Sequence, residues 1–177
     1  MVRIFAQYDK LEQSEQDEIE ILILLDNKKT MLGTKRNKML EIAQGEYVAF
    51  ADDDDVLESD YLLSLLKATE TNCDIITFPV RVTLNGEPPK NCYYSIEYEH
   101  DFDTPATYYR LPNHIMCVKK DLAMAVKYRP ILYGEDADYS KRLKAHLKTE
   151  HNIDKVLYNY VWNVETTETQ FHLKSIK

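Results

Sequence analysis

Glycine, proline, positive charge and long apolar runs are all scarce in this chain of 177 residues. With only 4 glycines and 6 prolines, the chain cannot be a flexible linker, a collagen-like repeat or a low-complexity tract. Lys and Arg number 22 against 30 Asp and Glu, and the net charge of -8 disfavours a nucleic-acid partner or an anionic lipid surface. No apolar run approaches the length of a membrane span, so we expect no membrane-spanning segment.

Cysteine is also scarce, and its spacing fits neither a disulfide framework nor a zinc site. The three cysteines are Cys73, Cys92 and Cys117, an odd number with no CxxC pair. We expect reduced thiols and a cytoplasmic location, because the chain also opens without the apolar core of a signal peptide.

The rest of the composition is that of a folded protein. Apolar residues make up 44% of the chain and aromatic residues 11%. A chain of this length can bury roughly 70% of its unfolded surface in one core. We therefore predict a single domain over residues 1–177.

Strand-like and helix-like segments alternate in the first half of the chain. Residues 19–25 (IEILILL) are almost wholly apolar, which predicts a short strand covered on both faces. The other elements expected in this half are a helix over 2–16, a helix over 32–44 capped by Gly45, a strand over 47–51, a helix over 59–70, a strand over 73–84 and, after an Asn85-Gly86 turn, a strand over 93–98. This alternation predicts an α/β fold with a mainly parallel sheet flanked by helices.

The second half is less regular. We expect strands near 115–118 and 155–161 and helices near 121–127 and 135–148, with no repeat and no linker.

Acidic residues follow two predicted strands, at the edge where open α/β sheets bind ligands. Asp26 comes after IEILILL, and the run Asp52 to Asp55 comes after YVAFA. Four adjacent carboxylates repel one another by roughly 1 kcal/mol per close pair in water, so a divalent cation such as Mg²⁺ or Mn²⁺ would compensate them. The alternative is a solvated acidic loop that caps the next helix.

Arg36 is a basic residue on the apolar face of a predicted helix. It lies four residues from both Leu32 and Leu40, so it is expected to point toward the sheet. A cation near a helix N-terminus favours a bound phosphate. The alternative is an ion pair with Asp26 or with one of the aspartates that follow YVAFA.

The segment YGED supplies a further candidate, Asp136. Asp136 is in helical phase with Leu143 and Leu147, so it is expected to face inward, whereas Glu135 is expected on a polar face with Asp138. The alternative is that both acids only complement the helix dipole.

Three segments carry a resemblance to a known family: ILILLDN, GTKRNKMLEIAQGEYVAFADDDDVLESDYL and YGEDADYSKRL. In that order they resemble the acid-terminated second strand, the Gly-x-x-x-Arg-Asn helix with its DxD strand, and the Glu-Asp motif of the family 2 glycosyltransferases. Members of that family are inverting enzymes of the GT-A fold. The resemblance implies a nucleotide-binding half over about 1–84 and an acceptor-binding half over about 85–177.

The resemblance also implies roles for the donor-side residues. Asp26 would contact the nucleotide base, Arg36 and Asn37 would line the nucleotide pocket, and Asp52 would face the ribose. The donor would be a nucleoside diphosphate sugar, with a uridine diphosphate sugar expected.

The resemblance also implies a metal ligand and a catalytic base. Asp54 would bind Mn²⁺ or Mg²⁺, although Asp53 or Asp55 would take its place in another register of the DxD motif. Asp136 would be the catalytic base acting on the hydroxyl of a glycan or other acceptor.

Two departures from the family pattern bear on this assignment. The chain begins at a helix rather than at the usual apolar first strand. We therefore expect an incomplete base pocket, in either a fragment or a natural short form. A partner such as a second copy could complete this pocket. The Gln-x-x-Arg-Trp motif is absent, which favours a non-processive enzyme.

Several alternatives stay open from the sequence. Clustered aspartates also suit a metal-dependent nucleotidyltransferase or phosphohydrolase, and the missing strand suits a non-catalytic nucleotide-binding or assembly module. His114 and His172 are either extra metal or phosphate ligands or ordinary histidines. Five tyrosines in the middle segment form either an acceptor platform or ordinary packing: Tyr93, Tyr94, Tyr98, Tyr108 and Tyr109.

Overall fold

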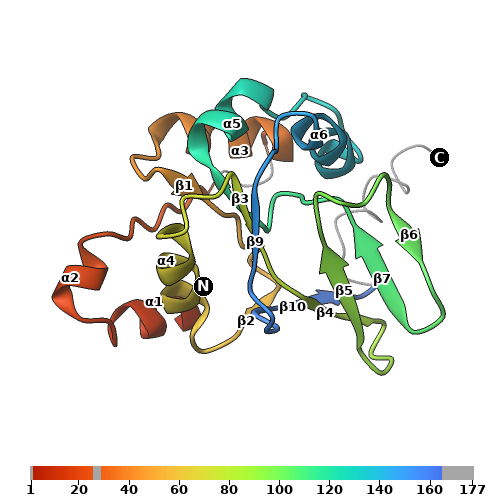
Figure 1. Cartoon of the computed structure of the whole chain (residues 1–177), viewed down its shortest axis with the longest axis horizontal. Coiled ribbons are helices and arrows are strands. Elements are labelled where there is room, and N and C mark those ends of the chain that lie inside the picture. Colours follow the sequence, from red (N-terminus) through yellow and green to blue (C-terminus); the bar gives the residue numbers. More distant parts are fainter. Residues whose placement is uncertain (1, 26–28, 165–177) are drawn as a thin grey trace.

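The computed structural model describes residues 2–25 and 29–164, which form two mixed sheets flanked by helices (Figure 1). The helices are α1 (Val2–Tyr8), α2 (Gln13–Gln16), α3 (Leu32–Ile42), α4 (Tyr61–Thr69), α5 (Lys120–Val126) and α6 (Glu135–Lys144). The strands are β1 (Tyr47–Val48), β2 (Val56–Leu57), β3 (Ile75–Thr77), β4 (Val80–Leu84), β5 (Lys90–Tyr94), β6 (Phe102–Asp103), β7 (Thr107–Arg110), β8 (Cys117–Lys119), β9 (Glu150–Asn152) and β10 (Tyr158–Trp162).

The first sheet has the order β1-β8-β3-β9, and the second has the order β2-β10-β4-β5-β7-β6. Among the described strands, β3 with β9, β10 with β4, and β5 with β7 are parallel, and the other neighbours are antiparallel. The predicted α/β class is therefore confirmed, but the sheets are mixed rather than mainly parallel. In the first sheet the reason is β8, a strand from the second half that inserts antiparallel between β1 and β3. In the second sheet the antiparallel pairs are β2 with β10, β4 with β5, and β6 with β7.

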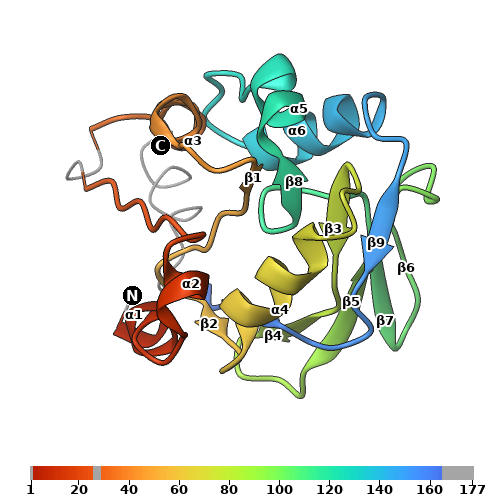
Figure 2. The same ribbon diagram turned by 60° about the vertical axis from the view of Figure 1, so that its left-hand side comes forward.

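The helices cover two sides of these sheets. Contacts join α3, α5 and α6 to one another, and α1 to α4. Figure 2 shows the first group together at one end of the molecule, while β6 and β7 lie on the side away from α1 and α2. No helix in the described part of the chain is long and apolar enough to cross a membrane.

The prediction of a buried strand over residues 19–25 is wrong. This segment has no regular structure, and its side chains are half-buried or exposed, with Ile23 at 46% and Leu25 at 83% exposure. A strand requires a hydrogen-bonded neighbour, and within the described residues the first sheet ends at β1. The apolar composition of this segment therefore did not suffice to make it a strand.

Other boundaries differ where local chemistry interrupts an element. The helix expected over 2–16 is two short helices, α1 and α2. The strand expected over 73–84 divides into β3 and β4, which belong to different sheets, and Pro79 lies between them without an N–H to donate.

Gly45 lies beyond the end of α3, whose cap is Ala43. The turn at Asn85-Gly86 is confirmed by positive φ angles of 50° and 75°, although its partner strand β5 starts at Lys90.

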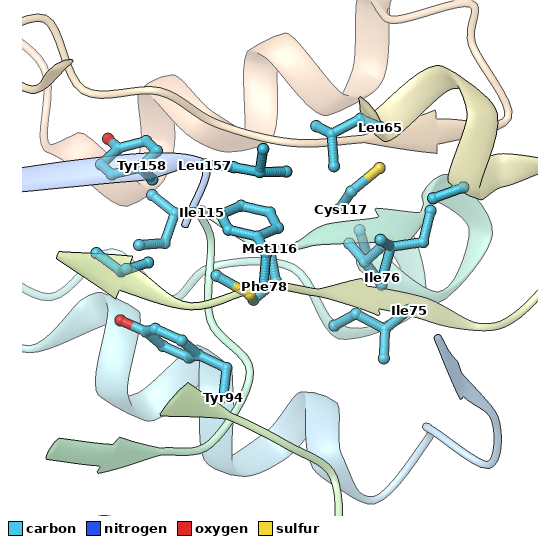
Figure 3. Close-up of a cluster of buried hydrophobic side chains, with 14 of the residues drawn as sticks. Leu65, Ile75, Ile76, Phe78, Tyr94, Ile115, Met116, Cys117, Leu157 and Tyr158 are labelled. Carbon is cyan, nitrogen blue, oxygen red and sulfur yellow. The ribbon is translucent and has the colours of Figure 1, made fainter. Parts of the chain in front are cut away.

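The core lies where the two sheets meet. Ile75, Ile76, Phe78, Met116 and Leu157 are fully buried there (Figure 3). Since β3 continues into β4 through Phe78, one packed layer holds both sheets in a fixed relation. The polar residues described next lie on α3, on α6 and in the loops that follow β1 and β7.

Candidate active site

Helix α3 is clamped against the segment that follows α5. A Cβ on Gly33 would lie 2.8 Å from the carbonyl oxygen of Arg129 and 3.0 Å from the Cβ of Tyr128, so only glycine allows this approach. The amide of Asn37 completes the clamp, because it donates to the Tyr128 carbonyl and accepts from the Tyr128 N–H, both at 2.8 Å. This packing turns Arg36 toward the interior.

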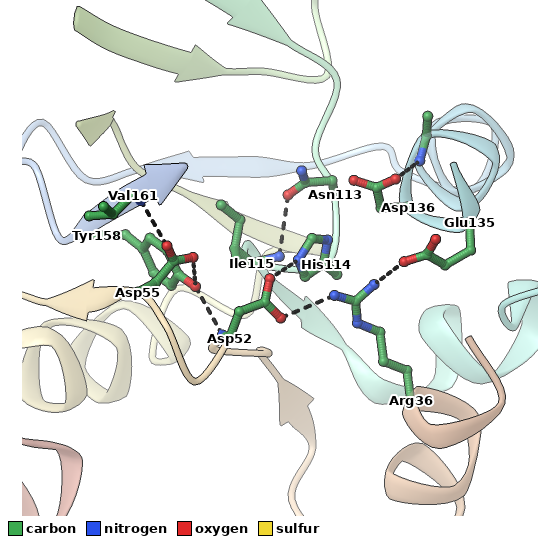
Figure 4. Close-up of polar contacts among 11 residues, drawn as sticks. Arg36, Asp52, Asp55, Asn113, His114, Ile115, Glu135, Asp136, Tyr158 and Val161 are labelled. Carbon is green, nitrogen blue, oxygen red and sulfur yellow. Dashed lines mark hydrogen bonds and ion pairs between the residues drawn. The ribbon is translucent and has the colours of Figure 1, made fainter. Parts of the chain in front are cut away.

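Arg36 is buried at 2% exposure between two carboxylates. Its Nη1 donates to Glu135 Oε1 at 2.9 Å, and its Nη2 donates to Asp52 Oδ1 at 3.1 Å (Figure 4). The guanidinium also lies 5.8 Å from the ring centre of Phe50 and 5.5 Å from that of Tyr128. Burial alone would lower the pKa of Arg36, but the neighbouring negative charges raise it above its ordinary value. Arg36 therefore joins α3, the aspartate run and α6.

Asp52 is held on its other side by His114. His114 Nε2 lies 3.2 Å from Asp52 Oδ2, and the Asp52 backbone N–H donates to the Tyr158 hydroxyl at 3.0 Å. Burial opposes ionisation, but the hydrogen bond and charge of His114, together with Arg36, hold the pKa of Asp52 below its ordinary value. The carboxylate of Asp52 is thus fixed in one orientation.

The four adjacent aspartates divide into two that contact the protein interior and two that face outward. Asp55 accepts from the Tyr158 hydroxyl at 2.7 Å and from the Val161 N–H at 2.9 Å. Asp53 and Asp54 are exposed at the tip of the loop. Tyr158 contacts both Asp52 and Asp55 but was not predicted from the sequence. It lies 106 and 103 positions away from these two acids along the chain.

Burial is the main reason why the pKa of Asp55 is raised to about 6, and the charges of Asp52 and Asp54 add to the effect. An acid with a raised pKa in the folded state binds more protons than the unfolded chain does, so the native state loses stability as pH rises through about 6.

We therefore expect the free energy of unfolding of the wild type, relative to Asp55→Asn, to decrease between about pH 4 and about pH 6. Urea denaturation of both proteins across this range measures the difference. Asp53→Asn, at an exposed neighbouring position, should keep the wild-type pH dependence. Parallel pH curves for wild type and Asp55→Asn would contradict this account.

A cavity of about 520 Å³ opens beside Asp52. His114 and Asp136 also line it, and Figure 4 shows Asp136 projecting from the start of α6 on the same side as Asn113 and His114. Asp136 is half-buried, and its Oδ1 accepts the Ala137 N–H at 2.8 Å. Gly134, with a φ of 72°, makes the sharp entry into α6 that sets this direction.

The expectation that Glu135 lies on a polar face is wrong. Glu135 is 8% exposed, because it pairs with Arg36 across the interface between α6 and α3. Helical phase counted from Leu143 and Leu147 did not show that a second helix would approach this side of α6. The acid at this position is a partner for Arg36 rather than a solvated charge.

The structure thus brings Arg36, Asn37, Asp52 and Asp136 to one region, with Asp54 on the adjoining loop. Asp26 and His172 lie outside the described residues. The sequence left the role of His114 open, and in the structure His114 contacts Asp52.

No group of three His, Cys, Asp or Glu side chains within residues 2–25 and 29–164 is arranged to hold a metal ion by itself. Within the aspartate run, Asp53 and Asp54 are the exposed carboxylates, and Asp52 and Asp55 are the more buried ones. One or two carboxylates together with a substrate phosphate are a usual set of ligands for Mg²⁺. The aspartate loop therefore fits a cation that is shared with a phosphorylated substrate.

The sequence model described as glycosyl transferase family 2 matches residues 5–127. EpsH of Bacillus subtilis (strain 168), which is named as a glycosyltransferase, is 33% identical over 86 residues, or 46% of this chain and 21% of EpsH.

Among solved structures, the 1–349 portion of S. aureus TarS matches with a TM-score of 0.58 and 17% identity, over 77% of this chain and 42% of that one. Its complex with UDP-GlcNAc gives a TM-score of 0.59 and 17% identity, over 90% of this chain and 45% of that one. The likeness confirms the GT-A type of α/β fold. The chain spans less than half the length of each of these relatives.

Proposed function

Because the chain belongs to glycosyl transferase family 2, we propose that it transfers one sugar from a nucleoside diphosphate sugar to an acceptor hydroxyl, with inversion at the anomeric carbon. The observation that carries the proposal is that Asp52 and Asp136, from opposite halves of the chain, line one cavity of about 520 Å³. The UDP and UDP-GlcNAc complexes of TarS support a uridine diphosphate sugar as donor. In this proposal residues 1–84 bind the donor and residues 85–177 bind the acceptor.

Asp136 is proposed as the general base. As the acceptor oxygen attacks the anomeric carbon, the bond from that carbon to the diphosphate oxygen breaks on the opposite face, and the hydroxyl proton passes to the Asp136 carboxylate. Attack opposite the leaving group inverts the configuration. The N–H of Ala137 donates to one oxygen of this carboxylate and fixes its orientation.

Asp52 is proposed to accept a hydrogen bond from the ribose. The ion pair with Arg36 and the contact with His114 hold the Asp52 carboxylate in one orientation, which suits an acceptor of hydroxyl hydrogen bonds. Arg36 and Asn37 are proposed to support the nucleotide pocket through other residues, since both side chains bind protein groups. Asp26 is proposed to contact the base.

Asp54 is proposed to hold Mn²⁺ or Mg²⁺ together with the diphosphate of the donor. When bound, the cation supplies positive charge to the departing diphosphate. The outward position of Asp54 and the engagement of Asp52 by Arg36 support this choice within the aspartate run.

Donor binding is therefore expected to require a divalent cation and to weaken at least about tenfold in Asp54→Ala. Titration calorimetry with UDP-GlcNAc, with MnCl₂ or with excess chelator, measures both effects. Asp53→Ala is the matched control, because it removes an adjacent exposed carboxylate. If Asp53→Ala instead abolishes binding, the metal ligand is one position earlier; equal affinity with and without chelator would refute the requirement.

Product analysis tests the function itself. Incubation with UDP-GlcNAc, MnCl₂ and a panel of glycoside acceptors should release UDP and form a new glycoside of inverted anomeric configuration, read by NMR. Release of a sugar phosphate or UMP would indicate a phosphohydrolase or nucleotidyltransferase. No product together with no heat of donor binding would indicate an assembly module.

A further inference from the structure

A second cavity, of about 560 Å³, lies where the end of β5 meets β9. Its lining includes tyrosine rings, acidic and basic side chains and an amide: Tyr93, Tyr98, Glu97, Lys148, Glu150 and Asn152. The volume lies within the range of ordinary ligand pockets. The proposed transfer reaction uses none of these residues.

This cavity adjoins a continuous set of aromatic rings on the outer face of β5, β7 and β6. Tyr93 pairs with Tyr109 in register, and their rings are stacked at 6.1 Å. Tyr109 in turn stacks on Phe102 at 4.5 Å with an angle of 8° between the planes, and Tyr98 meets both rings edge-on at 5.6 and 5.5 Å. We refer to Tyr93, Tyr98, Phe102 and Tyr109 as the aromatic strip.

The aromatic strip faces away from the catalytic cavity. Side chains alternate along a strand, and Cys92 and Tyr108 line the catalytic cavity, so the intervening Tyr93 and the following Tyr109 point to the other face. Phe102 is 42% exposed, and β6 is the last strand of its sheet among the described residues. Figures 1 and 2 both show these strands at the side of the molecule opposite α1.

The polar side of the cavity is built around Glu150. Its Oε2 accepts from the Ser95 hydroxyl at 2.8 Å and from the Ile96 N–H at 3.0 Å, and its Oε1 accepts from the Thr77 hydroxyl. A carboxylate held in this way is rigid and can still accept further hydrogen bonds. With two acids and one lysine in its lining, the cavity has no excess of positive charge to attract a polyanion.

We propose that this cavity and the aromatic strip form a second, non-catalytic binding site for a neutral oligosaccharide. Tyr109 is covered by Tyr93 on one side and by Phe102 on the other, so the outer faces of these two end rings are the apolar surfaces offered to the C–H faces of sugar rings. Glu97, Glu150 and Asn152 supply hydrogen-bonding groups for hydroxyls. An extended strip beside a cavity suits several sugar units in a row. The site goes beyond the proposed function, because it binds glycan on a face that the transfer step does not use.

The test is binding without donor. Saturation-transfer NMR with cellohexaose, chitohexaose and maltohexaose should give signals for at least one hexasaccharide, unchanged by added UDP and MnCl₂ and retained in Asp136→Asn. Tyr93→Ala and the more exposed Phe102→Ala should each weaken that binding at least about tenfold. Phe5→Ala is the control, because Phe5 is 40% exposed on α1, away from the strip.

Three results would overturn the proposal. They are no binding of any of the three hexasaccharides, loss of binding on addition of UDP or in Asp136→Asn, and an equal loss in Phe5→Ala. Thermal melting of each variant separates loss of the site from loss of the fold. Because donor is absent, failure here leaves the transferase assay unaffected, and failure of that assay leaves this test intact.

Discussion

Asp136→Asn is expected to lower the rate of sugar transfer by about 10² to 10⁴-fold, while the donor Kd changes by no more than a few-fold. Asparagine keeps the shape of the side chain but cannot take a proton from the acceptor hydroxyl. The residues that hold Asp52 and the aspartate loop lie on other elements, so donor binding should survive. Initial rates and calorimetry on one preparation measure the two quantities.

Asp121→Asn is the matched control for this experiment. Asp121 is also an acid in the first turn of a helix, but it is exposed on α5 and does not line the catalytic cavity. Its rate should stay near that of the wild type. Near-normal transfer by Asp136→Asn would assign the base to another residue, and a rise in donor Kd that matches the loss in rate would make Asp136 a binding residue.

The second large effect is expected for Arg36→Met, which should lower the free energy of unfolding by about 3 to 5 kcal/mol. The substitution keeps the aliphatic packing but removes the cation shared by Asp52 and Glu135, and Glu135 then remains buried without its charge partner. Urea denaturation measures the loss. Lys38→Met makes the same change of residue type at an exposed position of α3 and should change stability little.

Donor binding by Arg36→Met tests whether Arg36 supports the proposed nucleotide pocket. In the structure both terminal nitrogens of the guanidinium are engaged by protein carboxylates, so Arg36 is proposed to act on the nucleotide pocket through Asp52. Weakened donor binding by a folded variant would fit this arrangement, because an unpaired Asp52 loses its fixed orientation. A variant as stable as the wild type would show that the buried pair contributes nothing to folding.

Arg36 also shows why the halves of the site depend on one another. Its guanidinium is the common partner of Asp52, on the donor side, and Glu135, which directly precedes the proposed base. A displacement of α3 would therefore move Asp52, the acid proposed to face the ribose, and the start of α6 together.

The sequence by itself determined the α/β class, the inward direction of Arg36 and the place of the aspartate run beyond a short apolar segment. A strand was expected over residues 47–51 of that segment, but only Tyr47–Val48 forms one. These features follow from local chemistry: the three- and four-residue spacing of apolar side chains puts Arg36 on the packed face of its helix, and a short apolar run ends where polar residues begin. The turn at Asn85-Gly86 belongs to the same group, since these residues tolerate the positive φ that it needs.

Only the tertiary structure decided which of these residues meet. Glu135 pairs with Arg36, which is 99 positions away in the sequence, and Asp55 accepts a hydrogen bond from the Tyr158 hydroxyl, which is 103 positions away. Residues 19–25 have the composition of a strand but lack a neighbour for their backbone groups. The physical reason is the same in all three cases. Ion pairs and strand ladders form between surfaces that packing brings together, and local periodicity does not specify which distant surface arrives.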